Sequence, residues 1–397
     1  MNVGSSTKNG SNERLMSEKA CLLVSVLFFG TMALSGRLAA QEQDTTFDRI
    51  WQFAEWYNND DNPIIQSMAL SGRVQYEYGR VEDGGLTYDE WNLRRTRFGA
   101  EWELFHQFTL HLEAGFNPQE RDPLYKRLTD FNLEWSRGSS LAITVGKQGV
   151  PFTIDGSTSS KELLTIDRSN LANNMWFPQE YMPGISVSGE QGEWVYQTGI
   201  YSAGERNREF GNFSASAFTL ISIGYDLGES LGVEEALVRG NYIYQDPNLG
   251  NTFTRQLKHV ASLNLKLESE RWGLRTDLSK GQGYLGRSNV WGTTFMPYLS
   301  VTPKLQLLTR LTHIASQDIN GVRLARYEKS LISGWGDRYK ELYIGTNYFF
   351  YGHALKLQTG VKLADMSDSA LDGGSYSGAS WTTGLRVSWE SFASSAD

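Results

Sequence analysis

The sequence predicts an all-β chain: a transmembrane antiparallel β-barrel of about 16 strands, preceded by a short N-terminal helix. Three observations predict this fold. Apolar and polar residues alternate with a period of two in many segments, which gives each segment one apolar and one polar face. Most of these segments exceed the ~5–6 residues of globular strands and approach the ~9–11 that a tilted strand needs to cross a bilayer. The connections between them alternate between long and short, as transmembrane barrels require.

The N-terminal region predicts export. Lys19 precedes an apolar run from Ala20 to Leu34, and the small residues Ala39 and Ala40 follow it. This order is typical of a secretory signal peptide, which we assign to residues 1–40, and about 15 apolar residues are too few to span a bilayer comfortably. Met16 offers a more typical start for such a signal.

Residues 41–65 form a predicted periplasmic segment ahead of the barrel. Within it, residues 44–58 place Phe47, Ile50 and Trp51 at helical spacing, which predicts a short amphipathic helix. A simple periplasmic extension is the plainer interpretation, and a subunit contact or partial plug is the alternative.

The barrel itself is predicted over residues 66–392, followed by a C-terminal tail at 393–397. In 355–363 the odd positions are apolar or Thr, whereas the even positions are Lys, Gln or Gly. The composition agrees, since 19 Tyr, 19 Phe and 12 Trp stand against only 9 Pro, which would remove ladder hydrogen bonds. The predicted strands are 66–80, 90–104, 107–116, 125–137, 140–149, 183–190, 193–203, 215–228, 235–246, 257–268, 271–280, 290–301, 304–314, 338–351, 353–366 and 378–391.

Long connections are expected at one end of the barrel and short turns at the other. An even number of strands leaves both chain ends on the periplasmic side. The longest connection, 150–182, is a candidate to fold into the barrel. The other long loops are expected at 81–89, 117–124, 204–214, 247–256, 281–289, 315–337 and 367–377.

Composition excludes several classes of function. Cys21 is the only cysteine and falls within the signal, so the mature chain has no disulfide, thiolate nucleophile or cysteine metal site. The net charge is −8, and residues 1–40 contribute +2, so the mature chain carries −10. We therefore expect no nucleic-acid partner, which would favour a basic surface. No cofactor is implied.

Five motifs carry a family resemblance. They span roughly the first half of the chain, in the order NLRRTRFG at 92–99, VGKQGVPF at 145–152, TSSKE at 158–162, IDRS at 166–169 and PGISVSG at 183–189. In these motifs the chain resembles the phosphate-selective porin O/P family. The resemblance implies a channel in the cell outer membrane, bounded by lipid and forming a homotrimer, through which small anions such as phosphate diffuse passively.

The side chains of the predicted lumen would then carry the selectivity. Parity brings basic residues inward from strands that are neighbours once the barrel closes, as a basic arc: Arg73, Arg95, Arg97, Lys356, Lys362 and Arg386. Acids lie on the second to fourth strands: Glu101, Glu113, Asp130 and Glu134. By resemblance to porins the loop at 150–182 narrows the barrel, with the candidate constriction residues Lys161, Glu162, Asp167 and Arg168.

Each candidate has a plainer interpretation, since a lumen charge can serve only to solvate the wall or to pair with a neighbour. Arg95 and Arg97 stand out because the family motif and the parity argument agree there. Arg94 has outward parity, which predicts contact with lipid headgroups. Lys147 is also off parity, which makes it a candidate anchor for the start of the long loop.

Three alternatives to an anion channel remain open at the level of sequence. A non-selective general porin would follow if opposed acids balance the basic arc. An outer-membrane barrel hydrolase would need a catalytic constellation, yet the five His residues form no metal-ligand motif and no Gly-x-Ser-x-Gly motif occurs. A structural barrel that links the envelope to other layers would need an occluded lumen and a long periplasmic domain.

Overall fold

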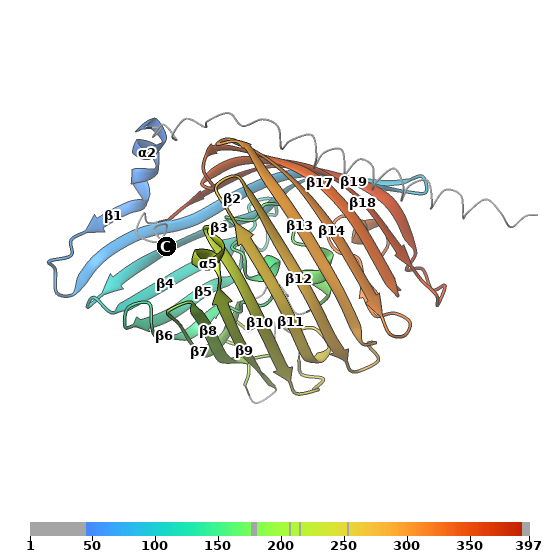
Figure 1. Cartoon of the computed structure of the whole chain (residues 1–397), viewed down its shortest axis with the longest axis horizontal. Coiled ribbons are helices and arrows are strands. Elements are labelled where there is room, and N and C mark those ends of the chain that lie inside the picture. The colour runs from blue at the N-terminus through green and yellow to red at the C-terminus, as the bar shows by residue number, and fades with distance from the viewer. Residues whose placement is uncertain (1–44, 176–180, 206–207, 214–215, 252–253, 391–397) are drawn as a thin grey trace, which may run out of the picture. The chain divides into compact units, whose positions relative to one another are not determined.

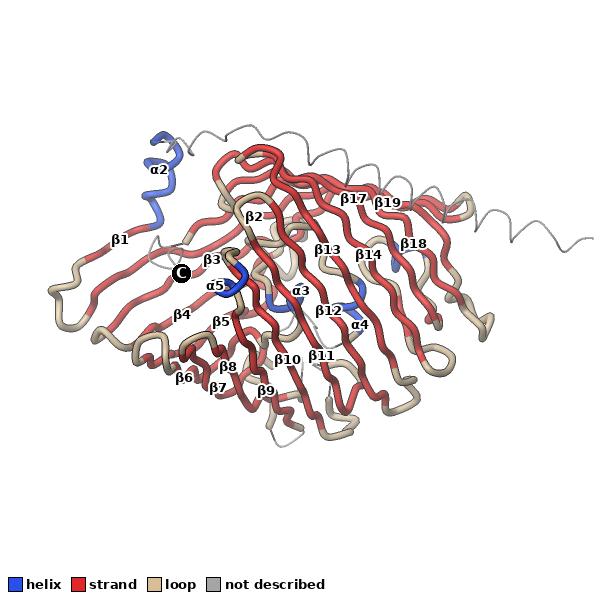
Figure 2. The backbone as a smooth tube through the Cα atoms, in the orientation of Figure 1, coloured by secondary structure: helices blue, strands red, loops and turns tan. Residues whose placement is uncertain are grey.

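The fold is known from a computed structural model that describes residues 45–175, 181–205, 208–213, 216–251 and 254–390. The predicted signal peptide and the predicted tail lie outside these residues. In the described part of the chain, sixteen antiparallel strands close a barrel (Figures 1 and 2). They are β2 (Ile65–Asp83), β3 (Leu86–Leu104), β4 (Phe108–Phe116), β5 (Tyr125–Ser136), β6 (Ala142–Gly149), β7 (Tyr181–Gln191), β8 (Trp194–Ser202), β9 (Ala217–Asp226), β10 (Glu235–Gln245), β11 (Leu257–Glu268), β12 (Trp272–Gly283), β13 (Val290–Thr302), β14 (Leu305–Ser316), β17 (Arg338–Tyr351), β18 (Leu355–Ser367) and β19 (Tyr376–Trp389).

Each strand pairs with the next in sequence, and the barrel closes where β19 pairs with β2. Gly378 lies opposite Asp83 at one end of this seam, and Trp389 lies opposite Gly72 at the other. The fold class and the sixteen strands predicted from sequence are therefore confirmed.

Side-chain alternation accounts for the strands. On β14, Leu307 and Leu311 are exposed on the outer wall, whereas Gln306, Arg310 and Thr312 are buried on the inner side. An apolar outer face suits lipid, and a polar inner face suits a water-filled or hydrogen-bonded interior. None of the helices in the described ranges is long and apolar enough to cross a membrane.

The connection between β2 and β3 differs from the prediction. A long loop was expected at 81–89, but both strands continue until only Gly84 and Gly85 separate them. Both glycines have positive φ, at 55° and 95°, which a two-residue hairpin turn requires. The polar residues around this turn lowered the strand signal, although the ladder runs on through them.

The N-terminal helix is present but shorter than expected. Helix α2 (Thr45–Trp51) and the 3-10 turn η1 (Gln52–Ala54) are followed by strand β1 (Glu55–Asn58), which pairs with β2. The helix docks on the turn end of the barrel, where Trp51 Nε1 donates to the carbonyl oxygen of Ser388 over 2.7 Å. Tyr351 donates to Asp48 over 2.6 Å at the same end.

The remaining short elements lie in the connections. They are α3 (Ile154–Ser157), α4 (Asn170–Asn174), α5 (Gly228–Leu231), β15 (Val322–Arg323), α6 (Glu328–Leu331) and β16 (Trp335–Gly336). Helices α3 and α4 belong to the connection between β6 and β7, and Figure 2 shows them behind the front wall of strands.

The main hydrophobic core lies inside the barrel, at the end where the long loops emerge. Inward-facing residues there are apolar rather than polar, and we call them the apolar collar: Val81, Tyr201, Phe218, Leu220, Ile243, Val260, Val290, Ile314, Tyr339, Met366 and Tyr376. Phe152, Leu171 and Met175 from one connection, and Val322, Leu324 and Tyr327 from another, pack into it. The lumen is thus polar in its middle and apolar towards the loop end.

Candidate functional site

The connection from β6 to β7 crosses the interior of the barrel. We call its described part, residues 150–175, the inner loop. Its backbone accepts hydrogen bonds from wall residues on several sides of the barrel: Gln75 donates to the Ser160 carbonyl over 2.8 Å, and Lys356 donates to the Leu163 carbonyl over 2.8 Å. From the β12 side, Asp277 accepts from the Ile154 amide over 2.8 Å.

The inner loop is built by local capping as well as by wall contacts. The Thr153 hydroxyl accepts from the Gly156 amide at the start of α3, and the Ser169 hydroxyl accepts from the Ala172 amide at the start of α4. These caps satisfy backbone groups that a short helix leaves unpaired. The wall side chains satisfy much of the remaining backbone, which is what a loop needs to be stable away from bulk water.

Part of the basic arc is paired with acid inside the barrel. Arg73 donates to Glu113 over 2.9 Å and to the Ser160 hydroxyl over 2.7 Å. Arg97 donates to the same carboxylate over 3.1 Å and to the Tyr181 hydroxyl over 2.6 Å. Glu113 is fully buried, and a carboxylate with two guanidinium partners is well compensated for its loss of hydration.

The other members of the basic arc are also engaged. Arg386 reaches Glu77 over 2.5 Å, and Arg95 donates to Gln75 over 2.8 Å. Lys362 lies 2.5 Å from Glu328. Lys356 is held by the inner loop. Lys356, Lys362 and Arg386 thus connect the barrel wall to the long connections inside it, whereas Arg95 is bonded to another residue of the wall.

The predicted acids apart from Glu113 line the same stretch of wall. Asp130 lies 4.0 Å from His111, and Glu134 accepts from the Thr144 hydroxyl over 3.0 Å. Glu101 is half-buried on β3, directly opposite His111 in the ladder.

The four candidates on the inner loop have different surroundings. Lys161 pairs with Glu390, and Asp167 lies 3.1 Å from Arg326. Arg168 donates to the carbonyls of Asp155 and Thr158, which closes the loop on itself. Glu162 is the exposed member and faces a cavity.

Arg94 corrects the parity argument. Its outward parity predicted contact with lipid headgroups, which is wrong: its Nε lies 3.9 Å from Asp167 on the inner loop. The ladder shifts register here, because Gln75 pairs with Arg95 while Tyr76 pairs with Leu93. Arg94 is the extra residue of a β-bulge, and a bulge changes the direction of the side chain that it carries.

Lys147 does not anchor the inner loop. Its Nζ lies 2.6 Å from Glu209 in the connection between β8 and β9. Tyr125 and the Leu128 amide also donate to this carboxylate. Burial would raise the pKa of Glu209, but the hydrogen bonds from Lys147 and Tyr125 outweigh it and hold the pKa below its usual value.

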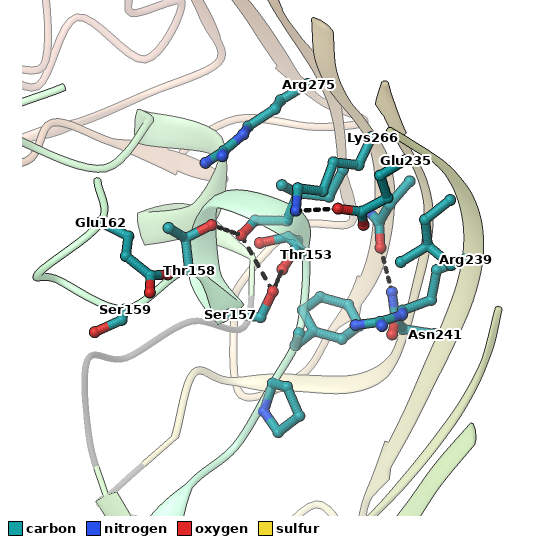
Figure 3. A pocket seen from close by; sticks show the side chains of 15 residues that line it. Thr153, Ser157, Thr158, Ser159, Glu162, Glu235, Arg239, Asn241, Lys266 and Arg275 are labelled. Carbon is teal, nitrogen blue, oxygen red and sulfur yellow. Dashed lines mark hydrogen bonds and ion pairs between the residues drawn. The ribbon is translucent and has the colours of Figure 1, made fainter. Parts of the chain in front are cut away.

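A cavity of about 320 Å³ lies between the inner loop and strands β10, β11 and β12 (Figure 3). The wall contributes Glu235, Arg239, Lys266 and Arg275, and the loop contributes Glu162. Lys266 and Arg275 are paired with acids, at 2.5 Å from Glu235 and 2.6 Å from Glu268 respectively.

Arg239 differs from its neighbours. Among the residues that the structure describes, it makes no hydrogen bond or ion pair, and it is half-buried. The sequence analysis did not single out the three cations of the cavity wall, Arg239, Lys266 and Arg275. The same parity rule would have placed them inward, but they lie on strands without a recognised motif.

A metal centre has no support in the described ranges, where no group of three or more His, Cys, Asp or Glu side chains is placed to hold an ion.

Comparison with known proteins agrees with this architecture. The sequence model of the family described as phosphate-selective porin O and P matches residues 68–293. A comparison with curated protein sequences found no match.

Solved structures with the same fold come from several bacteria. OmpF of Salmonella typhi, in a complex with daunomycin, superimposes with a TM-score of 0.58 at 10% identity, over 84% of this chain and 100% of that chain. The outer membrane channel DcaP of Acinetobacter baumannii gives 0.54 at 13% identity, over 81% and 97%. OmpT, an outer membrane protein of Vibrio cholerae, gives 0.55 at 11% identity, over 81% and 97%. At these identities the likeness shows the fold.

Proposed function

The chain belongs to the phosphate-selective porin O and P family and is an outer-membrane porin, and from that premise we propose that it passes small anions along the wall formed by β10, β11 and β12. Movement follows the solute gradient, so the proposal includes no catalytic step and no cofactor. The observation that carries it is the state of Arg239, whose guanidinium lines the cavity and, among the described residues, has no carboxylate within ion-pair distance.

The distribution of paired charges supports this path. Four members of the basic arc are paired with acids: Arg73 and Arg97 with Glu113, Lys362 with Glu328, and Arg386 with Glu77. A cation already paired with a buried acid offers little net charge to a passing ion. An unpaired guanidinium can bind an oxyanion through two parallel hydrogen bonds. The inner loop then forms one side of the constriction and the β10–β12 wall forms the other.

The pore-lining residues predicted from the sequence have two different roles in this proposal. Arg73, Lys356 and Arg386 fix the inner loop in place through Ser160, Leu163 and Ile166. Arg97 joins Glu113 to Tyr181 at the start of β7. Arg95 contributes positive potential, since its one hydrogen bond within the described residues goes to the neutral Gln75. Glu101, Asp130 and Glu134 face the lumen on the opposite side from the cavity wall.

A non-selective porin is the second candidate function, and Glu162 favours it. This exposed carboxylate lines the same cavity as Arg239, so the two can set up a transverse field that admits ions of both signs. The two candidates differ in the sign and size of the reversal potential.

The test is the reversal potential of purified protein in a planar bilayer under a KCl gradient. We expect stepwise conductance with anion preference, and a reduced preference in Arg239→Gln. Lys280→Gln, at an exposed outward position of β12, is the matched control. An unchanged permeability ratio in Arg239→Gln would remove Arg239 from the path. Cation preference in the unaltered protein would reject the anion proposal.

The regions outside the barrel complete the proposal. We propose that residues 1–40 are a cleaved signal, that 41–65 remain in the periplasm, and that the protein is a homotrimer.

Strands β4, β6 and β8 support the trimer, since their 9, 8 and 9 residues make this the low side of the wall. A low wall is better covered by a neighbouring subunit than by a full bilayer leaflet.

A further inference from the structure

A second long connection also enters the barrel. Residues 317–337 join β14 to β17 and carry β15, α6 and β16, and we call them the clamp loop. The ring of Tyr327 lies flat on β2 at Gly79, where a Cβ would overlap the ring. On α6, Glu328 reaches Lys362 of β18 over 2.5 Å and accepts from the Ser380 hydroxyl of β19 over 3.0 Å.

The clamp loop rests directly on the inner loop. The side-chain amides of Asn170 and Asn174, on α4, both donate to the carbonyl of Arg323, over 3.0 and 2.8 Å. The amide of Arg323 donates back to Asn174 over 2.9 Å. These reciprocal bonds fix the relative position of the two loops in the way that a strand ladder fixes two strands.

One side chain connects both loops and the wall. Arg326 of the clamp loop lies 3.1 Å from Asp167 of the inner loop and also donates to Glu77 of β2. Glu77 in turn is bonded to Arg386 of β19. Removing Arg326 leaves two partly or fully buried carboxylates short of a cation, which strongly disfavours this arrangement.

Apolar packing reinforces the polar contacts. Val322, Leu324 and Tyr327 are buried in the apolar collar together with Leu171 and Met175 of the inner loop. The collar therefore forms a hydrophobic core that exists only while both loops are inside the barrel. This explains why inward-facing residues at the loop end are apolar in a protein with a polar lumen.

We infer that the clamp loop is a second constriction element, and that Arg326 and Tyr327 set the effective width of the pore at the loop end of the barrel. The inner loop narrows the middle of the lumen. The clamp loop holds the inner loop in that position and itself occupies part of the lumen at the loop end of the barrel. This inference rests on the porin function and is independent of the preference for anions.

The test uses the full-length protein with Arg326→Gln and Tyr327→Ala. The readouts are single-channel conductance and the uptake of neutral sugars of increasing size into proteoliposomes, since neutral probes respond to width and not to charge. Lys329→Gln is the matched control, because Lys329 lies on the same loop with its side chain exposed. Heat-dependent migration of the barrel on gels reports whether each variant is folded.

We expect both variants to raise the conductance about twofold or more and to admit larger sugars, with Lys329→Gln unchanged. Folded variants with the conductance and sugar cut-off of the unaltered protein would overturn the inference, as would a fall in conductance. If the unaltered protein does not conduct, the proposed anion path along β10, β11 and β12 is rejected, whatever the variants do. Variants that conduct in that case support the clamp loop as the barrier, and variants that do not conduct overturn it.

Discussion

Arg73 on β2 and Glu113 on β4 lie on either side of β3, and the guanidinium spans that strand to reach the carboxylate over 2.9 Å. Arg97 on β3 binds the other oxygen of the same carboxylate over 3.1 Å. Three neighbouring strands are thus joined on their inner face by side chains as well as by their backbone ladders. The same Arg73 also donates to Ser160, so the inner loop is attached to this network.

Removing the central carboxylate should therefore affect stability more than selectivity. Glu113→Ala leaves two buried guanidinium groups without their partner, which we expect to cost about 3–5 kcal/mol. The measurement is the shift of the urea unfolding midpoint in detergent. Glu120→Gln, at an exposed position in the connection between β4 and β5, is the control and should not shift it. A midpoint for Glu113→Ala equal to that of the control would contradict the proposed network.

Charge reversal separates the two arginines that the sequence singled out. Arg95 is bonded to the neutral Gln75, so Arg95→Glu should fold and lower the anion preference. Arg97 faces Glu113 and Tyr181, so Arg97→Glu places two carboxylates together and should lower the yield of folded barrel. Reversal potentials and the folded fraction on gels test the two expectations. If Arg95→Glu and Arg97→Glu lower the folded fraction equally, the ion pair of Arg97 with Glu113 does not make Arg97 more important for folding than Arg95.

Much of the barrel follows from the sequence because a period of two is a local property. Alternation over 355–363 requires no knowledge of which strand lies alongside, and all sixteen strands were found this way. The two-residue turn at Gly84 and Gly85 was missed because polar residues around it weakened the pattern. The bulge at Arg94 could not be read, since it depends on the register with β2.

The site was harder to predict because it depends on which charges meet. Arg386 and Glu77 are 309 residues apart, and Arg326 and Asp167 are 159 apart. Parity gives the face of each side chain but not its partner. The clamp loop was read only as a long connection, although the apolar residues Val322, Leu324 and Tyr327 in it are a signal that part of the loop is buried.

The backbone at Gly146 makes a further prediction. Its φ is 128°, and a Cβ there would overlap the carbonyl oxygen of Phe131 and lie 2.8 Å from the Cα of Asn132. Gly146→Ala should therefore disturb the β5–β6 ladder directly before the inner loop and lower the folded yield. Gly240→Ala is the matched control on another strand, since the nearest atom to its Cβ is 4.0 Å away. Normal folding of Gly146→Ala would show that the ladder adapts at this point.

The Glu209 contact predicts a dependence of stability on pH. The carboxylate accepts from Lys147, Tyr125 and the Leu128 amide, and its pKa is lowered in the folded protein. A lowered pKa means that the contact stabilises the fold above the ordinary glutamate pKa of about 4.3, and that this stabilisation is lost as pH falls through the lowered value. Glu209→Gln should therefore unfold at a lower temperature than the unaltered protein at pH 7. The gap should narrow as the pH is reduced below about 4, where the unaltered carboxyl also becomes neutral. Thermal unfolding in detergent between pH 3 and pH 8 measures it. A gap that stays constant across this range would mean that Glu209 acts through packing and not through its charge.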